Sequence, residues 1–327
     1  MSTSAARAWV EIDLPAIDRN VGRIKQALPP HVRYVAVVKA NAYGHGMPEV
    51  ATRLLQAGVD CFAVANVAEA AILREVGHEA DILLLSPTLP TELARAVALG
   101  LDITLNSLAE AQALAALVRG RDRRAKVHVK VDTGMGRAGV WHEQAAALFA
   151  FVLAEPGLEW RGVYTHFSDA DHDQAFTAGQ RATFLRLLET IPASVRAGLL
   201  IHADNSAGLE SFSSAAPFNA VRVGLMQYGL PPSAGSFLAS LRPEPVLSFL
   251  SALMPGAVPL LARPTGSSSP ESARRRLSSS PPARRSTCSF LNMRRSRSRN
   301  SLSWPRAAMV RTSSAVLPRR WAASSRV

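Results

Sequence analysis

Lys39 is the residue with the clearest chemical potential in this sequence. It follows the apolar run "YVAVV" at 34–38 and precedes the small polar stretch "ANAYGHG" at 40–46. A lysine is most often a surface residue whose stem covers apolar neighbours. Here the flanking residues are apolar or small, and burial lowers the pKa of a lysine. Such a lysine can form a Schiff base with an aldehyde cofactor, pyridoxal phosphate.

Other apolar runs in the chain also end on polar residues. After Lys39 these are Asn66, Ser86, Asn106, Asp132, His166, Asn205 and Arg222. Taken singly, His166 is more often a structural histidine, Tyr43 a rim aromatic and Arg137 a solvated loop residue. Chance would scatter polar residues along the chain. Their repeated placement therefore favours one shared site.

The elements that must position these residues alternate between β-like and helix-like segments. The expected strands are 34–39, 61–66, 81–86, 102–106, 126–132, 160–166, 199–204 and 219–224. Amphipathic segments such as 67–77 and 107–120 lie between them, and Gly120 is a helix-stop signal. Strands joined by crossover helices form a parallel sheet. Eight such units predict an α/β fold, a (β/α)8 TIM-like barrel, whose functional residues lie at the carboxyl ends of the strands.

A doubly wound open sheet is the alternative to the barrel. It has the same alternation of strands and helices. No G-x-G-x-x-G follows the first strand, however, so the dinucleotide-binding form of that fold lacks its motif.

The positive charge of the chain is confined to its last part. The net charge is +12, but residues 251–327 hold 15 arginines, no lysine and the single acidic residue Glu271. Residues 1–250 are close to neutral. The tail is rich in Ser, Arg and Pro, and such a composition cannot offset chain entropy by burying apolar surface. We expect it to be disordered, either as a genuine basic tail or, as the all-arginine usage favours, as a GC-rich gene read in the wrong frame.

The remaining bulk features predict a cytoplasmic protein. The two cysteines, Cys61 and Cys288, have no partner motif, which fits a reducing compartment. The amino-terminal stretch has no apolar core of signal-peptide length, and no apolar run is long enough to span a membrane. No metal-ligand spacing stands out.

The stretch "AVVKANAYGHG" at 36–46 resembles the pyridoxal-phosphate attachment motif of alanine racemases. Further matches follow in the expected order, namely "KVDTGMGRAG" (130–139), "THFSDAD" (165–171), "HADNSAG" (202–208) and "VRVGLMQYG" (221–229). The resemblance covers residues 9 to about 250. It implies a (β/α)8 barrel followed by a mostly β domain, a homodimer, and the interconversion of L- and D-alanine that supplies D-alanine for peptidoglycan.

The resemblance also implies a role for each matched residue near the cofactor ring. Lys39 would carry pyridoxal phosphate and act as the base on one face, while His166 would lie against the pyridine ring. Arg222 would face the ring nitrogen, with His202 orienting it. Because arginine only donates hydrogen bonds, that nitrogen would stay unprotonated.

A second group of matched residues would hold the phosphate and the substrate. Tyr43 would reach the phosphate with its hydroxyl, and the loops after the last two strands would complete this phosphate site with Asn205, Ser206, Gly224 and Leu225. Arg137 would contact the phenolic oxygen of the cofactor and the substrate carboxylate. In some family members the lysine that matches Lys130 carries a carbamate that positions this arginine.

The chain departs from the family pattern after "PVLSF" at 245–249. The second base of the family is a tyrosine from the β domain, but the four tyrosines of this chain all precede residue 230. We therefore expect a strand segment at 1–13, a cofactor-binding barrel at 14–240 and an aberrant tail at 241–327.

The resemblance therefore implies an alanine racemase whose activity is impaired. The alternatives are a barrel that binds the cofactor without racemase activity and a racemase of serine or other small amino acids. A nucleic-acid binder that uses the Arg-rich tail is disfavoured, because aromatic residues for base stacking are nearly absent.

Overall fold

The computed structural model describes residues 7–77, 79–212, 216–232, 237–251 and 310–312. The described residues fall into two compact units. One comprises residues 14–246, and the other combines residues 7–13 with 247–251 and 310–312. Of the tail predicted at 241–327, residues 241–251 and the strand at 310–312 are described, and the rest lies outside the described residues.

The larger unit is a closed barrel of parallel strands. Its eight strands in chain order are β2 (Arg33–Val37), β3 (Cys61–Val64), β4 (Asp81–Leu84), β5 (Ile103–Leu105), β6 (Ala125–Asp132), β8 (Leu158–Tyr164), β9 (Leu200–His202) and β10 (Ala220–Val223). Parallel pairing joins the strands in two runs, β10-β2-β3-β4 and β5-β6-β8-β9. Backbone hydrogen bonds through Asp102 join β4 to β5, and Asn219 and Arg222 join β10 to β9. The expected TIM-like barrel is confirmed.

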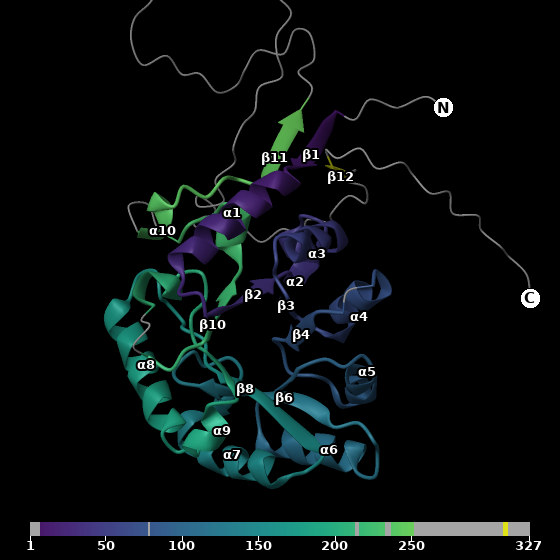
Figure 1. The fold of residues 1–327 in the computed structure, drawn as a ribbon, viewed down its shortest axis with the longest axis vertical. Coiled ribbons are helices and arrows are strands. Elements are labelled where there is room, and N and C mark those ends of the chain that lie inside the picture. Colours follow the sequence, from purple (N-terminus) through teal and green to yellow (C-terminus); the bar gives the residue numbers. More distant parts are fainter. Residues whose placement is uncertain (1–6, 78, 213–215, 233–236, 252–309, 313–327) are drawn as a thin grey trace, which may run out of the picture. The chain divides into compact units, whose positions relative to one another are not determined.

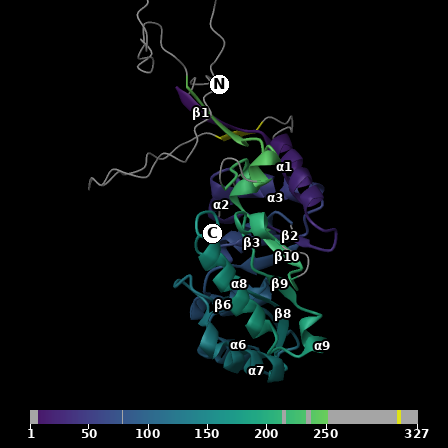
Figure 2. The same ribbon diagram turned by 90° about the vertical axis from the view of Figure 1, so that its left-hand side faces the viewer.

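Helices surround this ring of strands (Figure 1). They are α1 (Leu14–Ala27), α3 (Met47–Gln56), α4 (Val67–Glu75), α5 (Leu93–Ala98), α6 (Leu108–Val118), α7 (Ala145–Ala154), α8 (Gln174–Leu188), α9 (Ala193–Arg196) and α10 (Phe237–Ser240). The turn α2 (Lys39–Tyr43), the strand β7 (Val140–Trp141) and the 3-10 helices η1 (Pro90–Glu92), η2 (His142–Gln144), η3 (Gly208–Ser211) and η4 (Leu225–Tyr228) complete the unit. Figure 2 shows the barrel after a quarter turn.

Local sequence explains where several helices begin. Asn66 caps α4 by accepting the N–H of Glu69 at 3.0 Å, and Ser107 caps α6 by accepting the N–H of Glu110 at 3.2 Å. Asp173 does the same for α8 with the N–H of Phe176 at 2.8 Å. Such caps satisfy N–H groups that have no partner within the helix. They also leave each strand-to-helix loop with a defined course at the carboxyl end of the barrel.

The barrel is apolar toward the helices, and its interior combines an apolar cluster on β2, β3, β4 and β10 with polar residues on β5, β6, β9 and β10. Strands β3 and β10 are buried along their whole length, as expected for strands covered on both faces. Barrel interiors are usually filled by branched apolar side chains. Here buried polar and charged residues replace many of them, including Thr104, His128, Lys130, His202 and Arg222. Burying a polar group lowers the stability of a protein unless the group has a hydrogen-bond partner, so we expect these residues to be partnered or functional.

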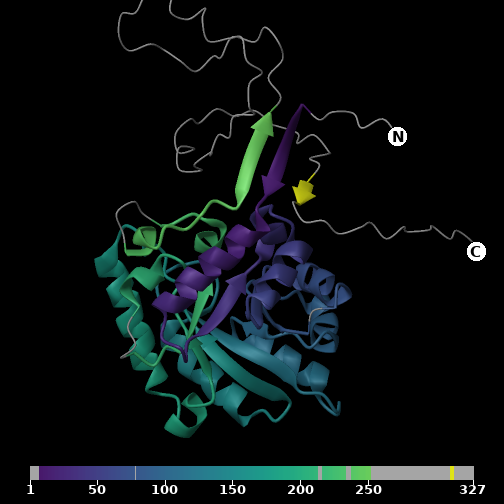
Figure 3. The same ribbon diagram turned by 45° about the horizontal axis from the view of Figure 1, so that its top comes forward.

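The smaller unit is a three-stranded sheet. Strand β1 (Ala8–Ile12) pairs antiparallel with β11 (Leu247–Ser251) and parallel with β12 (Val310–Thr312). Figure 3 shows these strands. No helix in the described part of the chain is long and apolar enough to cross a membrane.

Candidate active site

Lys39 begins a left-handed turn at the carboxyl end of β2. Ala40, Asn41, Ala42 and Tyr43 all have φ of 53° to 54°, a conformation that costs non-glycine residues about 1–2 kcal/mol each. The chain leaves β2 at Val37 and enters this turn two residues later. Lys39 is therefore held at the strand exit by a strained segment, as is common at functional sites.

Hydrogen bonds to Glu69 of α4 and to Asn41 of the turn itself hold the turn in place. Glu69 of α4 accepts the N–H of Ala40 at 2.7 Å and the N–H of Ala65 at 2.8 Å. The Asn41 carboxamide accepts the N–H of Met47 at 2.8 Å. Sequence reasoning did not single out Glu69. Its signal was the capping pattern of Asn66 followed three residues later by a glutamate.

Four cationic side chains, Lys39, Lys130, Arg137 and Arg222, lie near one another at this end of the barrel. Burial lowers the pKa of Lys39, and the positive charge of Arg137 lowers it further. Burial, followed by the charges of Arg137 and Arg222, lowers the pKa of Lys130 to about 8. The pKa of His166 lies well below its usual value through burial and the same neighbouring cations, so its imidazole is neutral. The interior at this end of the barrel is thus strongly positive and suited to an anionic ligand.

Asp132 organises the loop that carries Arg137. Its carboxylate accepts the backbone N–H groups of residues 134, 135, 136 and 137 at 2.8–3.2 Å. Burial alone would raise the pKa of Asp132, but these four donors outweigh it and the pKa is lowered. The carboxylate of Asp132 is thus used to hold the loop together, and the exposed side chain of Arg137 follows at the end of this turn.

Arg222 is buried at the centre of a hydrogen-bond network. Its Nη1 donates to His202 Nδ1 at 2.6 Å, and its Nη2 donates to the carbonyl oxygens of Thr165 and Ala203 at 2.8 Å and 2.9 Å. Nη2 also lies 3.3 Å from His166 Nδ1. Burial lowers the pKa of Arg222 to about 10, which leaves it charged at neutral pH. Among the described residues its Nε has no hydrogen-bond partner, so one donor is left for a ligand.

Tyr43, Ser206 and Gly224 form a small cradle, called here the Gly224 cradle. Ser206 Oγ accepts the N–H of Gly224 at 3.0 Å, which leaves its own proton free to donate. A Cβ on Gly224 would lie only 2.8 Å from Tyr43 Oη, so any other residue there would have to displace this hydroxyl. Burial raises the pKa of Tyr43 to about 12, so Tyr43 is a hydrogen-bond donor at neutral pH.

Two further residues predicted for this cradle flank it. Asn205 uses its side-chain oxygen to accept the N–H of Gly208 at 2.8 Å and so shapes the loop after β9. Leu225 follows Gly224 at the start of η4, and its side chain is 47% exposed. Any contact of Leu225 with an anion would therefore come from its backbone.

The strand-exit residues of the first half of the barrel have other tasks. Asn66 is a helix cap, and Asn106 donates to Glu110 Oε2 at 3.1 Å. The cations come instead from β2, β6 and β10. The structure therefore brings together only part of the residues that this pattern grouped.

The hydroxyls of the other tyrosines are used in hydrogen bonds within the protein. Tyr34 Oη donates to Gln227 Oε1 at 3.2 Å, and Tyr228 Oη donates to the Val37 carbonyl at 3.2 Å. Tyr164 Oη shares a hydrogen bond of 2.9 Å with Thr104 Oγ1. All three are buried. Tyr43 is then the one tyrosine with a hydroxyl directed at a ligand cradle.

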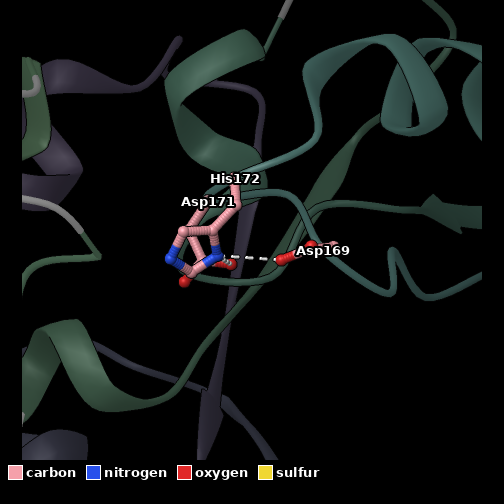
Figure 4. Close-up of side chains that lie close together, drawn as sticks. All are labelled: Asp169, Asp171 and His172. Atoms are coloured by element: carbon pink, nitrogen blue, oxygen red, sulfur yellow. Dashed lines mark hydrogen bonds and ion pairs between the residues drawn. The ribbon is translucent and has the colours of Figure 1, made fainter.

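A separate cluster lies in the loop after β8. His172 Nδ1 is 2.9 Å from Asp169 Oδ1 and 3.3 Å from Asp171 Oδ1 (Figure 4). All three residues are exposed, and exposed carboxylates often gather without an ion. We assign no ligand to this cluster.

Comparisons with known proteins place this geometry in a family. The family model described as alanine racemase, N-terminal domain, matches residues 12–232. Curated alanine racemases of Desulforamulus reducens and Geobacillus kaustophilus are 39% and 40% identical over 227 residues, or 69% of this chain. The chain spans 61% and 58% of the lengths of these two relatives.

Solved structures give the same result. The alanine racemase of Bacillus anthracis with bound L-Ala-P is 35% identical with a TM-score of 0.67, and the alignment covers 76% of this chain and 64% of that one. The biosynthetic alanine racemase of Pseudomonas aeruginosa is 34% identical with a TM-score of 0.66, covering 74% and 65%. From its barrel, its strand-exit lysine and these likenesses, the chain belongs to the alanine racemase family.

Proposed function

We propose that this protein binds pyridoxal phosphate at Lys39 and interconverts L- and D-alanine. The observation that carries the proposal is a half-buried lysine with a lowered pKa, set among Lys130, Arg137 and Arg222 at one end of a barrel. Lysines in such settings are the ones that react with carbonyl groups. Relatives that carry the name alanine racemase supply the substrate.

The residues present fit this cofactor. The cofactor is an anion, and the cation cluster needs one. The Gly224 cradle offers the hydroxyls of Tyr43 and Ser206 beside a glycine that leaves the Tyr43 hydroxyl in place. At the other end, Arg222 keeps Nε–H as a donor for the ring nitrogen, and a neutral His166 lies beside it. A fixed cation at that nitrogen disfavours its protonation.

The side chains of the barrel divide the reaction between them. When bound, pyridoxal phosphate supplies an aldehyde that condenses with an amino group and a ring that accepts electrons from the Cα–H bond. Lys39 Nζ takes the Cα proton on one face and returns it there. Arg137 holds the substrate carboxylate with paired N–H donors. Arg222 limits how far charge moves into the ring, which disfavours side reactions.

The second proton transfer is the weak point of this chain. Racemisation needs a proton donor on the face opposite Lys39. Tyr34, Tyr164 and Tyr228 are buried in hydrogen bonds, and Tyr43 lies at the Gly224 cradle. A water molecule or Lys39 itself would have to serve. We therefore propose slow racemisation by residues 1–327, and a barrel that binds cofactor without turnover is the second candidate.

A cofactor-labelling experiment tests the proposal. The purified chain, mixed with pyridoxal phosphate and then reduced with borohydride, should carry the label on the peptide that contains Lys39. The chain has only four lysines, Lys25, Lys39, Lys126 and Lys130, so mapping is simple. Lys39→Ala should lose the label and the visible absorbance, whereas Lys130→Ala is the matched control and should keep the label at Lys39. Equal labelling of Lys39→Ala would refute the assignment.

The wider role follows from the same proposal. Alanine is the proposed substrate in preference to serine, and a direct comparison of exchange rates for the two decides between them. The product D-alanine would serve peptidoglycan synthesis in the cytoplasm. We also propose that the chain forms a homodimer and that it divides into a strand segment at 1–13, a cofactor-binding barrel at 14–240 and a tail at 241–327. Nucleic-acid binding is not part of the proposal, because no observation on the described residues favours it.

A further inference from the structure

His128 lies inside the barrel, one hydrogen bond further from the candidate site than His202. Its Nδ1 is 3.3 Å from His202 Nε2, and His202 Nδ1 is 2.6 Å from Nη1 of Arg222. The three side chains come from β6, β9 and β10. They form a continuous line of hydrogen bonds across the barrel interior, and all three are at most 3% exposed.

The proton positions along this line follow from Arg222. Guanidinium N–H groups only donate, so His202 Nδ1 must accept and cannot carry a proton. The proton of a neutral His202 is then on Nε2, which donates to His128 Nδ1. His128 in turn carries its proton on Nε2. Both imidazoles are neutral, because burial lowers the pKa of His128 to about 3 and that of His202 well below its usual value.

The strand beside His128 is built around its ring. The pairing of β6 with β8 shifts register between Val127 and His128, with Trp160 opposite the first and Gly162 opposite the second. Such a bulge redirects a side chain. A Cβ on Gly162 would overlap Nδ1 and Cε1 of His128 and would lie 2.6 Å from the Leu200 carbonyl oxygen. Only glycine at this point of β8 leaves space for the imidazole.

The middle member of the line is fixed from the side. The His202 ring stacks on Tyr164 with centroids 4.7 Å apart and planes 8° apart, and Arg222 lies over the same tyrosine at 5.0 Å. Stacking fixes the plane of His202 but does not select its tautomer. A hydrogen-bond acceptor at Nε2 favours the same tautomer that Arg222 requires, and His128 is that acceptor.

We propose that His128 is a positioning residue: by accepting the Nε2 proton of His202 it keeps Nδ1 as the acceptor for Arg222, and it thereby aims the guanidinium. The consequence for catalysis rests on the proposed function, in which Arg222 Nε faces the cofactor ring. The hydrogen-bond order itself does not, since it involves protein groups alone. Outer hydrogen bonds of this kind commonly fix the tautomer of a functional histidine.

Histidine NMR on the cofactor-free protein tests the hydrogen-bond order. The full chain has eight histidines, and nitrogen-15 labelling reports for each ring which nitrogen carries the proton. We expect a neutral His202 with its proton on Nε2 and a neutral His128 with its proton on Nε2. A His202 that is charged, or protonated on Nδ1, would overturn the proposal. This result needs neither cofactor nor activity, so it is independent of the proposed function.

Two variants then separate positioning from simple packing. His128→Asn places an amide oxygen near the position of Nδ1 and keeps an acceptor, whereas His128→Leu has similar size and no acceptor. We expect the ring signals of His202 to shift in His128→Leu and to stay close to wild type in His128→Asn. In the loaded enzyme His128→Leu should lower kcat by about 2- to 10-fold, as for one lost neutral hydrogen bond. The KM for alanine should not change, because Arg137 is untouched.

The comparison of the two variants decides the outcome. Equal effects of His128→Asn and His128→Leu on the His202 signals would make His128 a packing residue and refute the proposal. An absence of any effect in both would refute it as well. If His128→Leu fails to fold, the wild-type tautomers and the His128→Asn spectrum still give the answer.

Discussion

Tyr43 and Gly224 approach each other so closely that they can be tested as one unit. A Cβ on Gly224 would lie 2.8 Å from Tyr43 Oη, closer than real Cβ contacts, but 3.5 Å from Cζ, an ordinary contact. Gly224→Ala must therefore push the hydroxyl away by several tenths of an ångström. Tyr43→Phe removes the same hydroxyl. The alanine in the double variant meets a ring it can touch without strain.

The magnitudes follow from these distances. Tyr43→Phe loses one hydrogen bond to a charged phosphate, about 1.5–3 kcal/mol or roughly 10- to 150-fold in affinity for pyridoxal phosphate. Gly224→Ala adds overpacking of about 1–3 kcal/mol and displaces the donor. Independent effects would add in the double variant. We expect instead that it binds no more weakly than Tyr43→Phe, a coupling of about 1–3 kcal/mol.

The assay is titration of each cofactor-free variant with pyridoxal phosphate, followed by absorbance. Tyr228→Phe is the matched control: its ring lies 5.4 Å from that of Tyr43, but its hydroxyl donates to the Val37 carbonyl, so affinity should not change. Thermal unfolding of each cofactor-free variant shows whether it folds. Strictly additive losses in the double variant would refute the reasoning.

Three further predictions concern other parts of the site. Deuterium uptake at Cα should be fast for D-alanine, the enantiomer that the family resemblance presents to Lys39, and about 10²–10⁴-fold slower for L-alanine; equal rates by proton NMR would reveal a second base. Asp132→Asn should raise the KM for alanine, because Asp132 holds the loop that carries Arg137, and should lower the free energy of unfolding by about 2–4 kcal/mol. The pKa of Asp132 is lowered in the folded protein, so its contribution to stability is lost as the pH falls. The stability difference between wild type and Asp132→Asn should therefore fade below about pH 4. The lowered pKa of Lys130 means that between pH 8 and 10 the unfolded chain binds more protons at this residue than the folded chain does. The free energy of unfolding should therefore rise from pH 8 to pH 10 by about 2–3 kcal/mol relative to Lys130→Met. Urea unfolding at both pH values measures this rise, which a carbamate on Lys130 would remove.

The strands were predictable because each is a short apolar run, but their ends were not. The run at 34–39 suggested a strand up to Lys39, whereas β2 ends at Val37. The cause is the left-handed turn. Positive φ is usually announced by glycine, and the stretch Ala-Asn-Ala-Tyr gives no such signal. The strand predicted at 160–166 likewise starts two residues later than the observed strand β8, because Leu158 and Glu159 already pair with β6.

The candidate site was predictable where a motif carried it and not where distance did. Nothing in the sequence brings Tyr43 next to Gly224, since closure of the barrel creates that contact. The sequence did contain a signal for the position of His128. In "KVHVKVD" the polar residues Lys126, His128, Lys130 and Asp132 alternate with valines, which predicts one polar face along a single strand. A prediction based on strand ends alone does not include these residues inside the barrel.

The left-handed turn after β2 sets stability against activity at a single place. Glycine normally weakens a protein, but at Ala40, which is exposed and has a φ of 54°, it would relieve about 1 kcal/mol. A screen for heat-resistant variants would therefore enrich glycine beside Lys39. The same change would widen the range of backbone conformations that carry the lysine. Evolution toward tolerance of heat and evolution toward turnover would thus pull this turn in opposite directions.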